Sequence, residues 1–252
     1  IIMCALNSMP YIISSIESFR RQKYNTKELI IVHSKSTDNT QHYLKGIKDK
    51  NIKKLKFNGS IYKALNFGIA KASGEIIGVL HSDDIFFSQK TLDQIVNKFK
   101  KKNADVVYGN VLFCKKNNLL KITRIWDNIN LTKNYEIPPH TGTFIKRKIY
   151  KKYKYNENYK ISSDTDLLIK IFKKKIRSSY LNKNITIMRT GGLSTNLFLF
   201  IKKAREDLKI FESHNLTFFD YLLKIFSKRK QVLSPKYFKK TKYQKILNNL
   251  SN

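Results

Sequence analysis

Short apolar runs alternate with amphipathic helical patterns over the first ~110 residues, and this alternation constrains the fold more than any other feature. The apolar runs predict strands at residues 1–6, 28–32, 52–57, 76–80 and 105–114. Between them, the spacing of apolar residues predicts helices at 11–22, after 40, at 61–72 and at 89–101. Strands and helices that alternate in this way are typical of a doubly wound sheet. We therefore expect an α/β fold with a mostly parallel, mixed sheet flanked by helices.

The second half of the chain has a different pattern. Residues 119–126 predict an edge strand, and a short apolar strand follows Pro138-Pro139-His140. A helix is predicted from Ser163, with Leu167, Leu168 and Ile171 on its inner face, and a last strand at 185–188. From about Phe198 the sequence is helical, basic and rich in aromatic residues.

The net charge of +32, from 50 Lys and Arg against 18 Asp and Glu, predicts an anionic partner. Nucleic acid, acidic lipid headgroups and a phosphorylated substrate all meet that requirement. Cys4 and Cys114 lie in apolar runs, so we expect buried free thiols. No apolar run approaches the ~18 residues that span a bilayer, and no basic segment precedes IIMCAL. A cytoplasmic protein without a signal peptide is expected.

Two adjacent carboxylates follow the predicted strand at 76–80, in the segment His81-Ser82-Asp83-Asp84. The carboxyl ends of strands are where open α/β sheets bind ligands. Carboxylate oxygens suit Mg²⁺ or Mn²⁺ shared with a substrate phosphate. The competing interpretation is that Ser82, Asp83 and Asp84 only cap the next helix, because these residue types are favoured there.

A second group of acids, Asp164 and Asp166, lies at the start of the helix predicted from Ser163. Capping and the helix dipole both favour acids at such a position, so a structural role is a serious alternative. The sequence contains no G-x-G-x-x-G after the first strand and no G-x-x-x-x-G-K-[ST] motif. The ordinary dinucleotide-binding and P-loop functions are therefore unsupported.

These pieces together resemble the inverting family-two glycosyltransferases of GT-A fold, which build bacterial surface polysaccharides. The resemblance covers roughly residues 1–194 and rests on these segments in order: IIMCALNS, ELIIVHSKSTDNT, IYKALNFGIAKASGEIIGVLHSDD, PHTGTFIKR, ISSDTDLLIK and RTGGLS. It implies a GT-A catalytic domain over 1–197, with a nucleotide-sugar-binding half at 1–114 and an acceptor-binding half at 115–197. A basic helical extension would occupy 198–252.

The resemblance also implies site residues. The donor-binding residues would be Ala5, Asn7, His33, Ser36, Asp38, Asn66, Ser82 and Asp83. Asp83, with Asp84 beside it, would hold the divalent metal, Mg²⁺ or Mn²⁺, on the sugar nucleotide's diphosphate. Asp164 matches the family's general base, with Asp166 as the second candidate. His140 falls in the acceptor-side loop, where a structural role is the alternative.

Two histidines depart from the family pattern. His33 stands where the family usually has the aspartate associated with the nucleobase, and His81 stands at the first position of its D-x-D motif. These changes leave the nucleotide open, with a uridine diphosphate sugar as the default.

The leading hypothesis is a metal-dependent, inverting glycosyltransferase that acts on a glycan or lipid-linked acceptor. The basic tail after Phe198 would hold it on the anionic inner face of the cytoplasmic membrane. The alternative is that the tail only packs its helices against the catalytic domain, and both roles are compatible. The alternatives are a basic nucleic-acid-binding protein, a nucleotidyltransferase, and a catalytically impaired relative that acts as a binding module. No helix-turn-helix, zinc-finger or RNP-type motif is present, so no specific nucleic-acid partner is expected.

Overall fold

The computed structural model describes residues 1–127, 136–174, 176–191 and 197–233. Its first sheet is parallel and contains β1 (Ile2–Ala5), β2 (Leu29–His33) and β3 (Ile52–Lys56) in that order. A parallel bridge between Ile2 and Val79 joins β1 to the chain just after β4. The two sheets therefore form one continuous surface.

The second sheet is mixed. Its strand order is β4 (Ile76–Gly78), β8 (Thr143–Lys146), β6 (Val106–Lys115), β9 (Ser178–Arg189) and β5 (Ile85–Phe86), and β7 (Asn118–Trp126) pairs with β6. The pairs β4–β8 and β6–β8 are antiparallel, and β6–β9 is parallel. The pairs β5–β9 and β6–β7 are antiparallel as well, so among the described strands the parallel pairing expected for most of the sheet is confined to β1–β2–β3 and β6–β9. The predicted α/β fold with a mixed sheet flanked by helices is confirmed.

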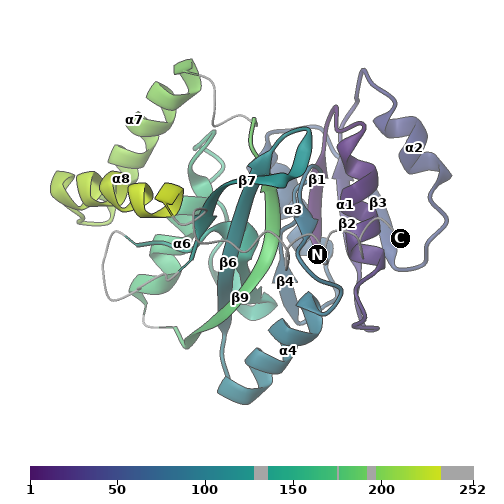
Figure 1. Ribbon diagram of the computed structural model, residues 1–252, viewed down its shortest axis with the longest axis horizontal. Helices are drawn as coiled ribbons and strands as arrows, with labels where there is room; N and C mark the ends of the chain where they lie inside the picture. The colour runs from purple at the N-terminus through teal and green to yellow at the C-terminus, as the bar shows by residue number, and fades with distance from the viewer. Residues whose placement is uncertain (128–135, 175, 192–196, 234–252) are drawn as a thin grey trace.

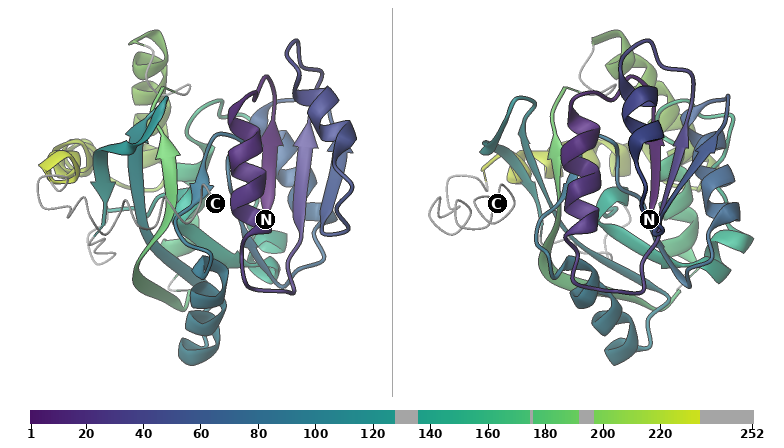
Figure 2. Two further views of the ribbon diagram at one scale, coloured as in Figure 1. Left: turned by 45° about the vertical axis from the view of Figure 1, so that its right-hand side comes forward. Right: turned by 90° about the vertical axis from the view of Figure 1, so that its right-hand side faces the viewer.

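Helices cover both faces of this surface, as Figures 1 and 2 show. They are α1 (Tyr11–Arg20), α2 (Thr40–Gly46), α3 (Ile61–Lys71), α4 (Thr91–Lys102), α5 (Arg147–Lys152), α6 (Ser163–Lys173), α7 (Leu197–Ser213) and α8 (Phe218–Leu233). A short 3-10 turn, η1 (His140–Gly142), precedes β8. Among the described residues, no helix has both the length and the apolarity needed to cross a membrane.

Side chains of β1 and β2 alternate between two apolar cores, as the period of two along a strand requires. Ile2 and Ile30 pack with α3, whereas Met3 and Ile31 pack with α1. Parallel strands buried on both faces are nearly continuous apolar runs, which is why these strands could be found in the sequence.

The limits of several strands differ from the prediction. The strand predicted at 185–188 is the end of β9, which is twelve residues long, and the two-residue strand β5 was not predicted. β4 ends at Gly78, earlier than expected. Much of β9 is polar, so an apolar run marks only its last part in the sequence.

The C-terminal helices pack against the rest of the chain. Ile210 and Phe211 of α7 are fully buried in the core that contains Leu167 of α6. Asp207 of α7 lies 3.2 Å from Lys224 of α8, which ties the two helices together. The predicted boundary at 197/198 stays a prediction, and the part of the tail at 234–252 lies outside the described residues.

Glu206 of α7 fixes the backbone that leads into α6. Its carboxylate accepts hydrogen bonds from the N–H groups of Lys160, Ile161 and Ser162, at 2.9, 2.8 and 3.0 Å. Three donors on one carboxylate satisfy backbone groups that would otherwise be unpaired at the start of the helix. Glu206 thus holds the N-terminus of α6 in place.

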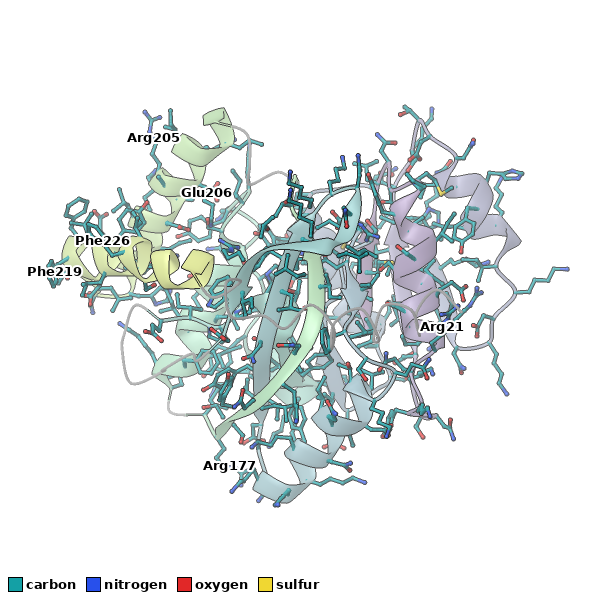
Figure 3. The ribbon with its side chains drawn as sticks, in the orientation of Figure 1. Arg21, Arg177, Arg205, Glu206, Phe219 and Phe226 are labelled. Carbon is teal, nitrogen blue, oxygen red and sulfur yellow. The ribbon has the colours of Figure 1, made fainter. Side chains whose placement is uncertain are left out.

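We expect Glu206→Gln to lower the free energy of unfolding by about 2 kcal/mol, because an amide offers these donors one accepting oxygen instead of two. Urea denaturation measures the change. The control is Arg205→Gln, since Arg205 is the exposed neighbour of Glu206 on α7 (Figure 3). An equal loss of stability in the two variants would contradict this account.

Glu28, directly before β2, holds the loop between α3 and β4. Its carboxylate accepts hydrogen bonds from Ser73 N–H, Ser73 Oγ and Gly74 N–H at 2.7, 2.7 and 2.8 Å, and from Lys53 at 2.9 Å. Burial alone would raise the pKa of Glu28, but these hydrogen bonds outweigh it and lower the pKa to about 2. The ionised form is therefore the stabilising one.

We expect Glu28→Gln to cost about 1–2 kcal/mol of unfolding free energy at neutral pH. The folded-state pKa lies below the ordinary 4.5, so this contribution is present above about pH 4.5 and is lost as the pH falls toward 2. Urea unfolding at a series of pH values should show the two proteins converging in acid. Glu75→Gln, at an exposed position of the same loop, is the control. A difference that stays constant with pH would show that the charge of Glu28 does not matter.

Candidate functional site

The loops after β1 and β2 meet at one edge of the sheet. Asn7 has a left-handed backbone (φ 48°), which asparagine tolerates better than most residues. Its Oδ1 accepts a hydrogen bond from Thr37 N–H at 2.8 Å, and its own N–H donates to Ser36 Oγ at 3.1 Å. Asp38 accepts from Met9 N–H at 2.9 Å. The predicted donor-binding residues Asn7, Ser36 and Asp38 are thus brought together.

Ala5 and His33 are partners in the β1–β2 register and lie at the ends of their strands. Burial, followed by the charges of Lys56 and Lys54, lowers the pKa of His33, so its ring is neutral at pH 7. Its Nδ1 is buried and has no hydrogen-bond partner among the described residues. A neutral ring offers one donor and one acceptor, whereas an aspartate offers acceptors only. The contact of His33 with a nucleobase stays a prediction.

Ser82 connects these loops to the chain segment after β4. Its hydroxyl lies 2.8 Å from the hydroxyl of Ser8, and Ser15 Oγ donates to the carbonyl of the adjacent His81 at 2.9 Å. The segment His81–Asp84 is therefore fixed against α1 and the first loop. Ser82 and Asp83 accordingly lie at the same edge as Asn7.

Asp83 is half-buried and Asp84 is fully buried. Burial raises the pKa of Asp83, although the charges of Arg189 and Lys116 oppose this. The pKa of Asp84 is raised well above its usual range by burial and by the neighbouring charge of Asp83. Asp84 Oδ1 accepts from Arg189 N–H at 3.3 Å, whereas its buried Oδ2 has no partner among the described residues. Because a bound cation would favour the ionised form of both neighbouring carboxyl groups, this pair is a candidate cation site.

These two carboxylates fit a Mg²⁺ or Mn²⁺ ion that a substrate completes. Within the described ranges, no three His, Cys, Asp or Glu side chains converge to hold a metal by themselves. Mg²⁺ is commonly held by one or two carboxylates together with substrate phosphates, so a larger protein cage is not required. The unpartnered Oδ2 of Asp84 agrees with such a site.

Asp164 lies at the first turn of α6 and is connected to His81 through His140. His140 Nδ1 is 3.1 Å from Asp164 Oδ2, and His140 Nε2 is 2.7 Å from His81 Nε2. The two rings meet edge to face with centroids 4.8 Å apart. A continuous chain of contacts thus joins the predicted base to the segment that carries Asp83.

The carboxyl group of Asp164 is ionised at neutral pH. Burial alone would raise its pKa, but the hydrogen bond from His140 and the charges of His140 and Lys203 lower it overall. The N–H of Thr165 adds to this effect. A side chain that is 25% exposed keeps the carboxylate accessible. An ionised, accessible carboxylate is the form that a general base requires.

Local partners occupy the polar groups of two predicted site residues. The amide N–H of Asn66 donates to Tyr155 O at 2.9 Å, and its Oδ1 accepts from Tyr155 N–H at 3.1 Å. Asp166 is only 2% exposed and is paired with Lys170 at 2.7 Å and His214 at 2.8 Å. The donor-binding role of Asn66 and the acceptor-side role of Asp166 as second candidate base stay predictions.

Two residues of this region were not predicted. Arg189, at the end of β9, donates to the carbonyl of Asp83 and to Ser14 Oγ, and stacks on Tyr11. Tyr62 of α3 directs its hydroxyl toward Ile161 O and Asp164. A basic residue directly after a predicted strand, in the segment RTGGLS, was the available signal for Arg189.

Several solved structures share this fold. S. aureus TarS 1–349 in complex with UDP-GlcNAc aligns with a TM-score of 0.63 at 20% identity, over 83% of this chain and 65% of that one. The mannosyltransferase PcManGT from Pyrobaculum calidifontis, in complex with GDP-Man and Mn²⁺, aligns with a TM-score of 0.62 at 18% identity, over 84% of this chain and 62% of that one. At these identities the likeness establishes the GT-A fold.

Relatives in sequence agree. An uncharacterised glycosyltransferase of Haemophilus influenzae is 26% identical over 89% of this chain and 74% of its own length. The β-1,3-glucosyltransferase WfgD of Escherichia coli is 32% identical over 48% of each chain. The minor teichoic acid biosynthesis protein GgaB of Bacillus subtilis is 28% identical over 69% of this chain and 21% of its own. This chain thus spans less than half of the length of the last two relatives.

The family model described as glycosyl transferase family 2 matches residues 1–164, from the first strand to Asp164. This match includes both groups of site residues described above. The chain belongs to glycosyl transferase family 2.

Proposed function

We propose that this chain transfers a sugar from a UDP-sugar to a hydroxyl group of a glycan or lipid-linked acceptor, with inversion and with a divalent metal. The observation that carries the proposal is the contact chain from Asp164 through His140 to His81, which joins an ionised base to the segment with Asp83 and Asp84.

The donor would lie at the strand ends, with its nucleoside near Asn7, Ser36 and Asp38. Asp83 and Asp84 would hold the Mg²⁺ or Mn²⁺ ion. When bound, the metal offsets the charge that grows on the nucleoside diphosphate as the glycosidic bond breaks. The guanidinium of Arg189 donates a hydrogen bond to the backbone carbonyl of Asp83. It therefore adds a positive charge beside the proposed diphosphate site.

The acceptor would be activated by Asp164. Its carboxylate takes the proton of the acceptor hydroxyl while that oxygen forms a bond to the anomeric carbon, and the bond from that carbon to the diphosphate breaks. Attack from the side opposite the leaving group inverts the anomeric configuration. No covalent enzyme intermediate is needed, so one carboxylate suffices.

Named relatives support the choice of substrates. TarS was solved with UDP and with UDP-GlcNAc, and PcManGT with Mn²⁺. WfgD is named for transfer from UDP-Glc to a diphosphoundecaprenol-linked GlcNAc. On this basis we assign UDP as the default nucleotide and a lipid-linked glycan as the acceptor class.

Helix α8 is proposed as the part that contacts an anionic membrane. Phe218, Phe219 and Phe226 are 63%, 65% and 52% exposed, and Figure 3 shows Phe219 at the outer side of α8. The same helix continues with the basic sequence Lys228-Arg229-Lys230. Exposed aromatic residues next to basic ones suit the interface of an anionic bilayer.

We expect Asp164→Asn to lower the rate of sugar transfer by about 10²–10⁴-fold while donor binding is retained, because the amide cannot take a proton. Asp83→Asn should weaken Mn²⁺-dependent donor binding. Release of UDP from UDP-glucose and UDP-N-acetylglucosamine, with water or an undecaprenyl-linked glycan as acceptor, measures the rate. Asp93→Asn on α4 is the matched control. Parental rates in both site variants would refute the assignment.

For α8, we expect the double variant Phe218→Ser, Phe219→Ser to bind phosphatidylglycerol vesicles about tenfold or more weakly, because two apolar side chains no longer enter the bilayer. Vesicle co-sedimentation measures the binding, and Ile13→Ser, an exposed apolar residue on α1, is the control. Unchanged binding in the double variant, or equal binding to phosphatidylcholine vesicles, would argue against this membrane contact.

A further inference from the structure

We propose that His140 is a positioning residue that gives the two oxygens of Asp164 different tasks. Its Nδ1–H holds Oδ2, and Oδ1 is left to take the proton of the acceptor hydroxyl. The inference deepens the proposed function and rests on it. Four observations carry it. They are the positions of the hydrogens between Asp164, His140 and His81, the hydrogen bonds that fix the backbone beside both histidines, the hydrogen bond of the Tyr62 hydroxyl, and the presence of a histidine at position 81.

The contacts of Asp164 fix where His140 carries a hydrogen. An ionised carboxylate only accepts hydrogen bonds, so the 3.1 Å contact with Asp164 Oδ2 requires a hydrogen on His140 Nδ1, whether the ring is neutral or charged. When the ring of His140 is neutral, its Nε2 is an acceptor. The 2.7 Å contact between the two Nε2 atoms then needs a hydrogen from His81, and each neutral ring has one tautomer.

The backbone on both sides of this pair is anchored. The carbonyl of His81 accepts from Ser15 Oγ at 2.9 Å and from Asp84 N–H at 3.1 Å. On the other side, Thr143 Oγ1 donates to Pro139 O at 2.8 Å, which fixes the turn that carries His140. Two anchored backbones make the ring pair a rigid support for Asp164, as a well-positioned base requires.

Among the described side chains, the Tyr62 hydroxyl is the contact of the second oxygen of Asp164. It lies 3.3 Å from Oδ1 but 2.5 Å from Ile161 O. A tyrosine has one hydroxyl hydrogen, and the shorter contact receives it. The carboxylate also accepts from the N–H of Thr165, but an oxygen with two lone pairs still has one left for the acceptor hydroxyl, which can reach the partly exposed side chain.

This assignment also gives a role to His81, at the position where the family often has Asp or Asn. An ionised aspartate at that position has no hydrogen to donate to His140 Nε2, whereas the Nε2–H of a neutral histidine does. His81 thus completes the support of His140 from the donor side of the site. We therefore infer that His81 and His140 act together to orient Asp164.

The first test is independent of any activity. In protein labelled with ¹⁵N-histidine, a long-range ¹H–¹⁵N spectrum at about pH 8, above the ordinary histidine pKa of about 6.5, reports the tautomer of each ring. We expect Nδ1–H for His140 and Nε2–H for His81. Asp164→Ala, which removes the acceptor of the Nδ1 hydrogen, should shift His140 toward Nε2–H. An Nε2–H tautomer of His140 in the parent would overturn the proposal.

The second test is kinetic and uses UDP release from UDP-glucose and UDP-N-acetylglucosamine with Mn²⁺. We expect His140→Ala to lower kcat by about 10- to 100-fold, with the donor KM unchanged, because the base loses its orientation. His140→Asn, whose amide N–H can replace Nδ1–H, should recover most of kcat. His42→Ala, at an exposed position of α2, is the control.

The outcomes separate the two proposals. Equal kcat values for the Ala and Asn variants, or a change in KM alone, would overturn the role of His140 while the glycosyltransferase activity stands. No UDP release by the parent from either donor, together with the expected tautomers, would overturn the proposed function and leave the hydrogen-bonded arrangement of Asp164, His140 and His81 established.

Discussion

The antiparallel pairing of β4 with β8 is the constraint on which the site depends. Gly78, the last residue of β4, is opposite Phe144 near the start of β8. The chain that leaves β4 therefore lies beside the chain that enters β8, and this brings His81 next to His140. Gly78 permits the pairing because the Phe144 ring occupies the space where a Cβ atom would lie. Without this strand register, His81 would not contact His140, and Asp164 would not be connected to the segment that carries Asp83.

The two halves of the sheet contribute different chemistry to this junction. The parallel strands β1 and β2 end in loops that hold one another through Asn7, Ser36 and Asp38. The mixed part contributes the carboxylates after β4, and α6 contributes Asp164. Helix α7 then supports α6 from outside through Glu206, so it takes part in positioning Asp164, the proposed base.

The sequence was sufficient to place a residue in the fold where that place depends on its neighbours along the chain. Asp83 follows a buried strand and Asp164 begins a helix, and both are local patterns. The contacts of Asn66 and Asp166 could not be predicted in this way, because their partners, such as Tyr155 and His214, are distant in the sequence. The pairing of His81 with His140 depends on an antiparallel strand pair that no local pattern encodes.

The central claim is that the edge of the sheet at Asn7, Ser82 and Asp83 is a metal-dependent nucleotide-sugar site. Calorimetric titration of the protein with UDP, GDP and CDP, with and without Mn²⁺, tests it most directly. The account predicts that UDP binds and that binding requires the metal. Absence of metal-dependent binding to all three nucleotides, together with tight, salt-sensitive binding of oligonucleotides, would contradict it and favour a nucleic-acid-binding protein.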